Sequence, residues 1–404
     1  METIHIARDT MHLTNQEEKM LSGEEGYAVQ KNMQILTALG DIFGADQMIP
    51  VSSVQVAGVS YYNLGDAGLE YLENLAAKGA KVRVKTTLNP AGMDLENWRE
   101  LGIDEGFARK QERVIQAFVN MGIIPSCTCT PYLVGNEPSA GDHIAWSESS
   151  AVTYANSVLR AMTNREGGPS ALAAAITGLT PSYGMHIEEN RKPRVRVKVD
   201  TKLRAVADFG ALGYAVGKKI GPKIPLFEGI EGAPVEQLKS LCASIATYGG
   251  TPLFHDSTSS RKEVPTETLT ITRNDIEAAL RALNDEAVEV DFVALGCPHC
   301  TLDEIKTIAG LLEGRRVTRE FWICTARQTM KEAEKTGDAQ KIRAAGAKFA
   351  CDTCMAVAPL KGRFTVLATD SAKACYYGRG TNDFKTRIGS VEECVNAAVT
   401  GKWS

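Results

Sequence analysis

Apolar runs of strand length alternate with helical patterns along most of this chain, and this alternation limits the possible folds more than any other feature. The last third shows it most clearly, with apolar runs at 288–295, 319–324, 348–350 and 364–368. Strand and helix in alternation favour a mainly parallel sheet covered by helices. We therefore predict an α/β fold in which right-handed crossovers bring the carboxyl ends of these strands to one edge of a sheet.

The earlier part of the chain follows the same pattern, after two helices within 15–43 that are interrupted near Ser22 and Gly23. Further strands are expected at 47–56, 81–87, 123–127 and 194–199, and helices at 66–78, 105–121, 203–218 and 233–248. Between Gly135 and Tyr183 the chain is rich in Gly, Ser, Ala, Asn and Thr, which suggests a lined cleft. The 404 residues suffice for two or three domains, and we place them at 1–134, 135–285 and 286–404.

The composition narrows the functional class. Hydrophobic residues make up 44% of the chain, charged residues 23%, and the formal net charge is only −4, which argues against binding of nucleic acid. The amino terminus lacks the pattern of a secretory signal, and no stretch has the roughly 20 apolar residues that cross a bilayer. We expect a cytoplasmic protein with a small-molecule substrate and no membrane partner.

Three short cysteine pairs are the strongest chemical signal. They are Cys127-Thr-Cys129, Cys297-Pro-His-Cys300 and Cys351-Asp-Thr-Cys354, and each follows an apolar run that we read as a strand. A reducing compartment makes disulfides unlikely for the ten cysteines, which favours metal binding or catalysis for the clustered ones. Iron–sulfur centres are held by cysteine thiolates on loops, so a cluster at the carboxyl ends of the strands is the leading interpretation.

Two other interpretations of the pairs stay open on the residues alone. Four thiolates from two Cys-x-x-Cys pairs can hold a structural zinc ion, although the fifty residues between Cys300 and Cys351 exceed the usual spacing. Cys297 and Cys300 can also form a thioredoxin-like redox pair. His299 is either a ligand, an acid or a packed structural histidine, whereas a structural role is favoured for His186. Arg165 and Lys373 are candidate anion binders.

Several motifs taken together resemble the aconitase X family nearly from end to end. They are Cys127-Thr-Cys-Thr-Pro-Tyr-Leu133, Glu148-Ser-Ser-Ala-Val152, Thr163-Asn-Arg-Glu-Gly-Gly-Pro169, Gly296-Cys-Pro-His299, Cys351-Asp-Thr-Cys354 and Asp370-Ser-Ala-Lys373. The resemblance implies a multi-domain aconitase-like α/β fold. It is strongest to the separately encoded large subunit, for which it implies dehydration of mevalonate 5-phosphate to trans-anhydromevalonate 5-phosphate in a modified mevalonate pathway. Members that dehydrate cis-3-hydroxy-L-proline, and a non-catalytic metal-binding scaffold, are the alternatives.

The resemblance also implies roles for particular residues. One cysteine of each pair, Cys129, Cys297 and Cys354, is expected to hold a 4Fe–4S cluster, with Cys127, Cys300 and Cys351 as the alternative member of each pair. The polar residues expected to line the substrate pocket are Ser60, Asn89, Glu148, Ser149, Ser150, Arg165 and Lys373. The catalytic base, a serine, is expected on a small swivelling-domain subunit, so this chain alone is expected to be inactive.

Overall fold

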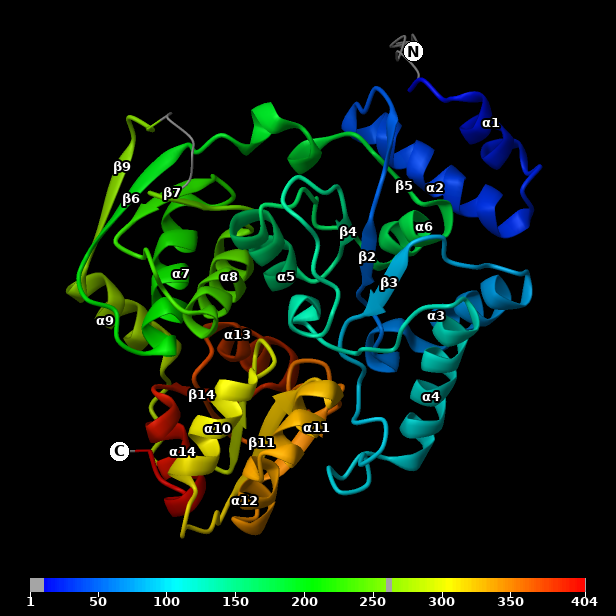
Figure 1. The fold of residues 1–404 in the computed structure, drawn as a ribbon. Helices are drawn as coiled ribbons and strands as arrows, with labels where there is room; N and C mark the ends of the chain where they lie inside the picture. Colours follow the sequence, from blue (N-terminus) through cyan, green and yellow to red (C-terminus); the bar gives the residue numbers. More distant parts are fainter. Residues whose placement is uncertain (1–10, 259–263, 404) are drawn as a thin grey trace, which may run out of the picture.

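Three parallel sheets form the framework of the molecule, and each carries its own helices (Figure 1). The computed structural model describes residues 11–258 and 264–403. In the first sheet the strand order is β3-β2-β4, in the second β8-β7-β6-β9 and in the third β12-β11-β10-β13-β14. Neighbouring strands are parallel in all three, which confirms the predicted fold class. A small antiparallel pair, β1 with β5, lies beside the first sheet.

The strands are short. Their bounds are β1 Met48–Pro50, β2 Ser53–Val56, β3 Lys85–Leu88, β4 Ala145–Trp146, β5 Leu179–Pro181, β6 Val195–Asp200, β7 Pro225–Glu228, β8 His255–Asp256, β9 Thr268–Thr272, β10 Phe292–Leu295, β11 Glu320–Thr325, β12 Lys348–Cys351, β13 Val366–Thr369 and β14 Lys385–Ile388. The strands at the middle of the third sheet are buried on both faces, as expected for a parallel sheet with helices on each side.

The α-helices alternate with these strands. Their bounds are α1 Asn15–Ser22, α2 Tyr27–Phe43, α3 Tyr61–Ala77, α4 Glu105–Asn120, α5 Ser149–Tyr154, α6 Gly168–Thr177, α7 Val206–Ile220, α8 Val235–Gly249, α9 Arg273–Leu283, α10 Leu302–Leu311, α11 Arg327–Lys335, α12 Asp338–Ala344, α13 Ala372–Asn382 and α14 Val391–Thr400. Figure 1 shows α5 and α13 near the middle of the molecule, between the three sheets. Among the described residues, no helix is both long and apolar enough to cross a lipid bilayer.

The first and third parts of the chain share a core. Met93, Trp98 and Leu101, from the segment after β3, pack with Phe292 and Trp322 of the third sheet. Such shared burial fixes the loops of the two sheets relative to each other, because apolar surface removed from water contributes about 25 cal/mol per Å². The ends of β3 and of the third sheet are therefore held side by side.

Two predicted features differ from the structure. The expected strand at 123–127 is only a single bridge between Thr87 and Ile124, because Pro125 has no N–H to donate to a ladder. The segment rich in small residues also contains α6, in which every residue from Ser170 to Thr177 is buried, so part of it is core and not cleft.

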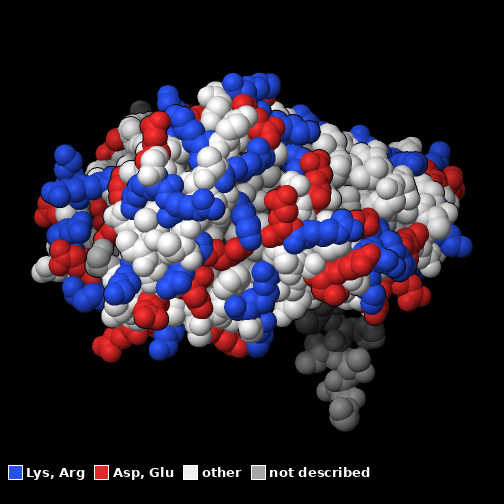
Figure 2. All heavy atoms as spheres, turned by 90° about the horizontal axis from the view of Figure 1, so that it is seen from below, with Lys and Arg blue, Asp and Glu red and all other residues white. Residues whose placement is uncertain are grey.

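The domain boundaries at 134 and 285 stay predictions. Figure 2 shows basic and acidic side chains interspersed over one face.

Candidate active site

A pocket of about 380 Å³ lies where strands of the first and third sheets end. Its walls come from residues that follow β2, β3, β4, β10, β12 and β13, which are all at carboxyl ends of parallel strands. Its lining includes Cys129, Cys297, Cys354, Asn89, Glu148, Ser149, Arg165 and Lys373. This is the edge at which open α/β sheets bind ligands, and the volume suits a small molecule.

One thiol from each cysteine pair lines this pocket. Cys129, Cys297 and Cys354 face it, while Cys127, Cys300 and Cys351 belong to the hydrophobic cores on either side. Among the described residues, no three His, Cys, Asp or Glu side chains lie close enough together to hold a single metal ion. Iron–sulfur clusters are held by cysteine thiolates on loops, so the three thiols that line this pocket are a donor set that fits such a group.

Glycine is required where the Cys297 loop leaves its strand. Gly296 has a φ of +96°, and a Cβ atom at this position would lie 2.0 Å from the carbonyl oxygen of Cys324 on β11. Only a residue without a side chain allows so close an approach in this conformation. Thr301 then begins α10 with a capping box to Glu304, so the loop is fixed at both ends.

Burial disfavours the charged form of the pocket thiols while no metal is bound. It raises the pKa of Cys297 to about 12, and it also raises the pKa of Cys129 and Cys354. Bound metal reverses this preference, since a coordinating thiol is deprotonated outright. Cys129 Sγ accepts the backbone N–H of His299 at 3.2 Å, and this hydrogen bond supports a thiolate.

A buried ion pair crosses the pocket wall between the first and third sheets. Lys373, in the first turn of α13, donates to the carboxylate of Glu148 and to Ser149 Oγ at 3.2 Å. Burial alone would raise the pKa of Glu148, but the ammonium of Lys373 and the Ser150 and Ala151 donors outweigh it and hold this pKa below its ordinary value. Both groups are therefore charged at neutral pH, and Lys373 is a cation instead of a base.

Arg165 is the exposed cation of the pocket, and no ion pair of this residue is found within the part of the chain that the structure describes. It precedes the N-cap of α6, Gly167, and Gly168 lies so close to the Ala57 carbonyl oxygen that a Cβ atom would stand 2.6 Å away. A helix amino terminus and an unpaired guanidinium both favour an anion. This corner of the pocket can bind a carboxylate or a phosphate.

The remaining expected residues occupy different positions. Asn89 lines the pocket, and its Oδ1 is buried without a hydrogen-bond partner. Ser60 and Ser150 are buried behind the wall: Ser60 Oγ donates to the Val357 carbonyl at 3.0 Å, and Ser150 donates to Glu148. Asn89 thus has an acceptor to offer a ligand, whereas the two serine hydroxyls are already engaged.

Several residues of the site were not anticipated from the sequence. Tyr377 lines the pocket one turn after Lys373 on α13, and this spacing of four residues on a helix was a usable signal. Asn63 and Thr381 also line it, without any motif that marks them. His186 lies elsewhere, where its Nδ1 is 3.0 Å from that of His143, so it takes no part in this pocket.

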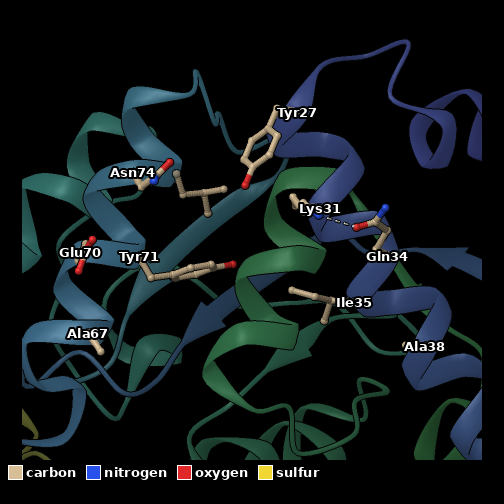
Figure 3. A pocket seen from close by; sticks show the side chains of 10 residues that line it. Tyr27, Lys31, Gln34, Ile35, Ala38, Ala67, Glu70, Tyr71 and Asn74 are labelled. Carbon is tan, nitrogen blue, oxygen red and sulfur yellow. Dashed lines mark hydrogen bonds between the residues drawn. The ribbon is translucent and has the colours of Figure 1, made fainter.

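A larger pocket of about 570 Å³ lies between α2 and α3 (Figure 3). Its lining includes Tyr27, Lys31, Glu70, Tyr71 and Asn74. The side chains in Figure 3 present no thiol and no converging set of titratable groups. Size alone therefore does not make this pocket the active site.

The three aconitase X domain models together match almost the whole chain. The first domain matches residues 10–189, the second 193–281 and the third 290–400. The crystal structure of aconitase X in its holo-form from Thermococcus kodakaraensis is similar with a TM-score of 0.90 and 44% identity, and the match covers 96% of this chain and all of that one.

Two curated relatives carry different names. The "Phosphomevalonate dehydratase large subunit" of Methanothermobacter thermautotrophicus is 48% identical over 92% of this chain and 94% of its own length. The "Cis-3-hydroxy-L-proline dehydratase" of Pseudomonas aeruginosa is 34% identical, and the match covers 96% of this chain but only 70% of that protein. With all three domain models matched in order, the chain belongs to the aconitase X family.

Proposed function

We propose that this chain is the large subunit of an iron–sulfur dehydratase that converts mevalonate 5-phosphate to trans-anhydromevalonate 5-phosphate in isoprenoid biosynthesis. The observation that carries the proposal is the meeting of three thiols, a buried Glu–Lys pair and an unpaired arginine around one pocket. The 48% identity to a phosphomevalonate dehydratase large subunit supports the phosphorylated substrate over the prolyl acid, whose dehydratase is 34% identical.

The cofactor that best fits the donor set is a 4Fe–4S cluster held by Cys129, Cys297 and Cys354. Three protein thiolates would leave one iron of such a cluster without a protein ligand, and the bound cluster would supply Lewis-acid chemistry toward the hydroxyl and carboxylate of the substrate. The protein side chains bind and orient the substrate and supply the charges of the pocket.

Charges in the pocket match the two anionic ends of mevalonate 5-phosphate. Arg165 and the amino terminus of α6 would bind the phosphate, because a guanidinium forms paired, charge-assisted hydrogen bonds with phosphate oxygens. Lys373 lies close to the thiols and would stabilise negative charge that develops on the substrate as the proton leaves. Asn89 Oδ1 would accept a hydrogen bond from the substrate hydroxyl.

Removal of the proton needs a base, and Glu148 is the carboxylate that lines this pocket. Glu148 is occupied by Lys373, Ser150 and the Ala151 N–H, so it is a weak base. We infer that a small subunit completes the site by adding a serine base. The relative's name as a large subunit supports this, and so does the additional length of the hydroxyproline dehydratase beyond the part that matches this chain.

The test is anaerobic reconstitution with the small subunit, followed by parallel assays on mevalonate 5-phosphate and cis-3-hydroxy-L-proline. The proposal expects turnover of the phosphate substrate by the complex and none by the large subunit alone. Turnover of only the prolyl acid would assign the chain to the other activity. A complex that holds a cluster but converts neither substrate would indicate a scaffold.

A further inference from the structure

His299 contacts all three cysteine loops. Its side chain is fully buried in the Cys297–Cys300 loop. Nδ1 lies 2.9 Å from Thr128 Oγ1, next to Cys129, and Nε2 lies 3.0 Å from the carbonyl oxygen of Thr353, next to Cys354. Among the described residues, no other side chain of one cysteine loop forms hydrogen bonds to both of the other loops.

The partners define where the ring proton is. A carbonyl oxygen only accepts, so Nε2 carries the hydrogen and donates it to Thr353. In the neutral ring Nδ1 then accepts from the Thr128 hydroxyl, whose oxygen in turn accepts the Thr130 N–H at 3.2 Å. Both ring nitrogens are engaged, so the imidazole is free neither to bind a metal nor to protonate a ligand.

The backbone of the same residue is held as firmly. Its N–H donates to Cys129 Sγ, and its carbonyl accepts from the ammonium of Lys239 on α8 at 2.7 Å. Lys239 is buried and paired with Glu304, near the start of α10. The histidine is thus anchored to the second part of the molecule while its ring spans the other two loops.

We propose that His299 is a positioning residue that holds the three pocket thiols at their spacing before and after a cluster binds. The inference rests on the proposed function, in that the thiols are taken to hold a cluster. The three cysteine loops come from distant parts of the chain. A buried ring with two directed hydrogen bonds fixes their positions relative to each other. Groups that orient metal ligands typically account for about 10- to 100-fold in metal affinity.

The test compares cluster retention in three variants at this position. His299→Leu removes both ring hydrogen bonds, His299→Asn keeps a polar atom near Nδ1, and His299→Gln keeps a donor near Nε2. We expect the Leu variant to lose iron to a chelator about 10- to 100-fold faster than the wild type, with the other two in between. The electron paramagnetic resonance signal of the reduced cluster should also shift, because the environment of Cys129 changes.

A second substitution keeps the test valid if His299→Leu fails to fold. Thr128→Val removes the Nδ1 partner from the other side. It should add little to His299→Gln, which lacks that hydrogen bond already, but it should add to His299→Asn. The matched control is His255→Leu, which removes another buried imidazole. Its Nε2 is 2.7 Å from the carbonyl oxygen of Arg191, and it lines a different pocket from the thiols.

The outcomes separate this inference from the proposed function. Wild-type protein that takes up no iron would refute the cluster, whatever the variants do. Wild-type protein that holds a cluster, together with a folded His299→Leu variant whose iron loss and resonance signal equal those of the wild type, would overturn the role of His299 alone. Faster iron loss in His255→Leu to the same extent would also overturn it, since the effect would then be general destabilisation.

Discussion

The two members of each cysteine pair lie in different surroundings, although only one or two residues separate them. Cys129, Cys297 and Cys354 border the pocket, although Cys297 and Cys354 also touch apolar side chains of the shared core. Cys127, Cys300 and Cys351 do not line the pocket and are packed in the first and third cores. The difference teaches that the two cysteines of a pair need not share one role, and it supports the proposal that only one of them is a ligand. One thiol lines the pocket, and the other packs in a core as a small hydrophobic residue: Cys127 and Cys351 at the start of their loops and Cys300 at the end of its loop.

The largest effect is expected for the three thiols that line the pocket. Cys129→Ser, Cys297→Ser or Cys354→Ser should each remove most of the bound iron and abolish dehydration by the complex, because a hydroxyl is a poor substitute for a thiolate ligand. Iron and sulfide analysis after anaerobic reconstitution, with the assay alongside, measures both. A serine variant with a full complement of iron would remove that cysteine from the ligand set.

The next largest effect is expected at the ion pair beside the thiols. Lys373→Met should lower kcat by about 10²- to 10³-fold, since it removes a preorganised charge that acts on the developing anion. The cluster should remain, because Lys373 is not a ligand, and the visible spectrum checks this. The control is Lys110→Met at the surface, where the ammonium pairs with the exposed Asp66. An unchanged kcat in Lys373→Met would place this ammonium outside the catalytic machinery.

A smaller and more selective effect is expected at Arg165. Arg165→Gln should raise KM for mevalonate 5-phosphate by about 10- to 100-fold, which corresponds to a charge-assisted hydrogen bond of about 1.5 to 3 kcal/mol. The value of kcat should change little, because the phosphate is bound equally before and during the reaction. Arg109→Gln, on the exposed face of α4, is the matched control. If kcat falls and KM does not change, Arg165 does not bind the phosphate.

The smallest effect is expected for the thiols that are packed in the hydrophobic cores. Cys300→Ser should lower the free energy of unfolding by about 1 to 3 kcal/mol, since it buries a hydroxyl among apolar atoms. The iron content and the activity of folded protein should match the wild type. Denaturant unfolding gives the first quantity, and iron analysis gives the second. Loss of the cluster in a folded Cys300→Ser variant would contradict the different roles of the pocket thiols and the core thiols.

The alternation of strands and helices allowed the parallel sheets to be predicted, because each element carries its own hydrophobic period. Sheet membership was not predictable: β4 pairs with β2, although β3 and α4 lie between them in the sequence, and no local pattern marks such a pairing. The strand at 123–127 failed for a local reason, the missing N–H of Pro125.

The candidate active site, like the fold, could be predicted from the sequence only in part. Motif position indicated the neighbourhood of Ser60 and Ser150 but not their side-chain directions, which hydrogen bonds to Val357 and Glu148 determine. The role of His299 was left open from the sequence because its partners, Thr128 and Thr353, come from distant loops.

The measurement that tests the central claim most directly is the Mössbauer spectrum of the iron-57 protein in complex with its small subunit, recorded with and without mevalonate 5-phosphate. If three pocket thiols hold a four-iron cluster, one iron lacks a protein thiolate, and its signal alone should shift when substrate is added. A spectrum without iron–sulfur signals, or one in which no iron responds to the substrate, would contradict the account.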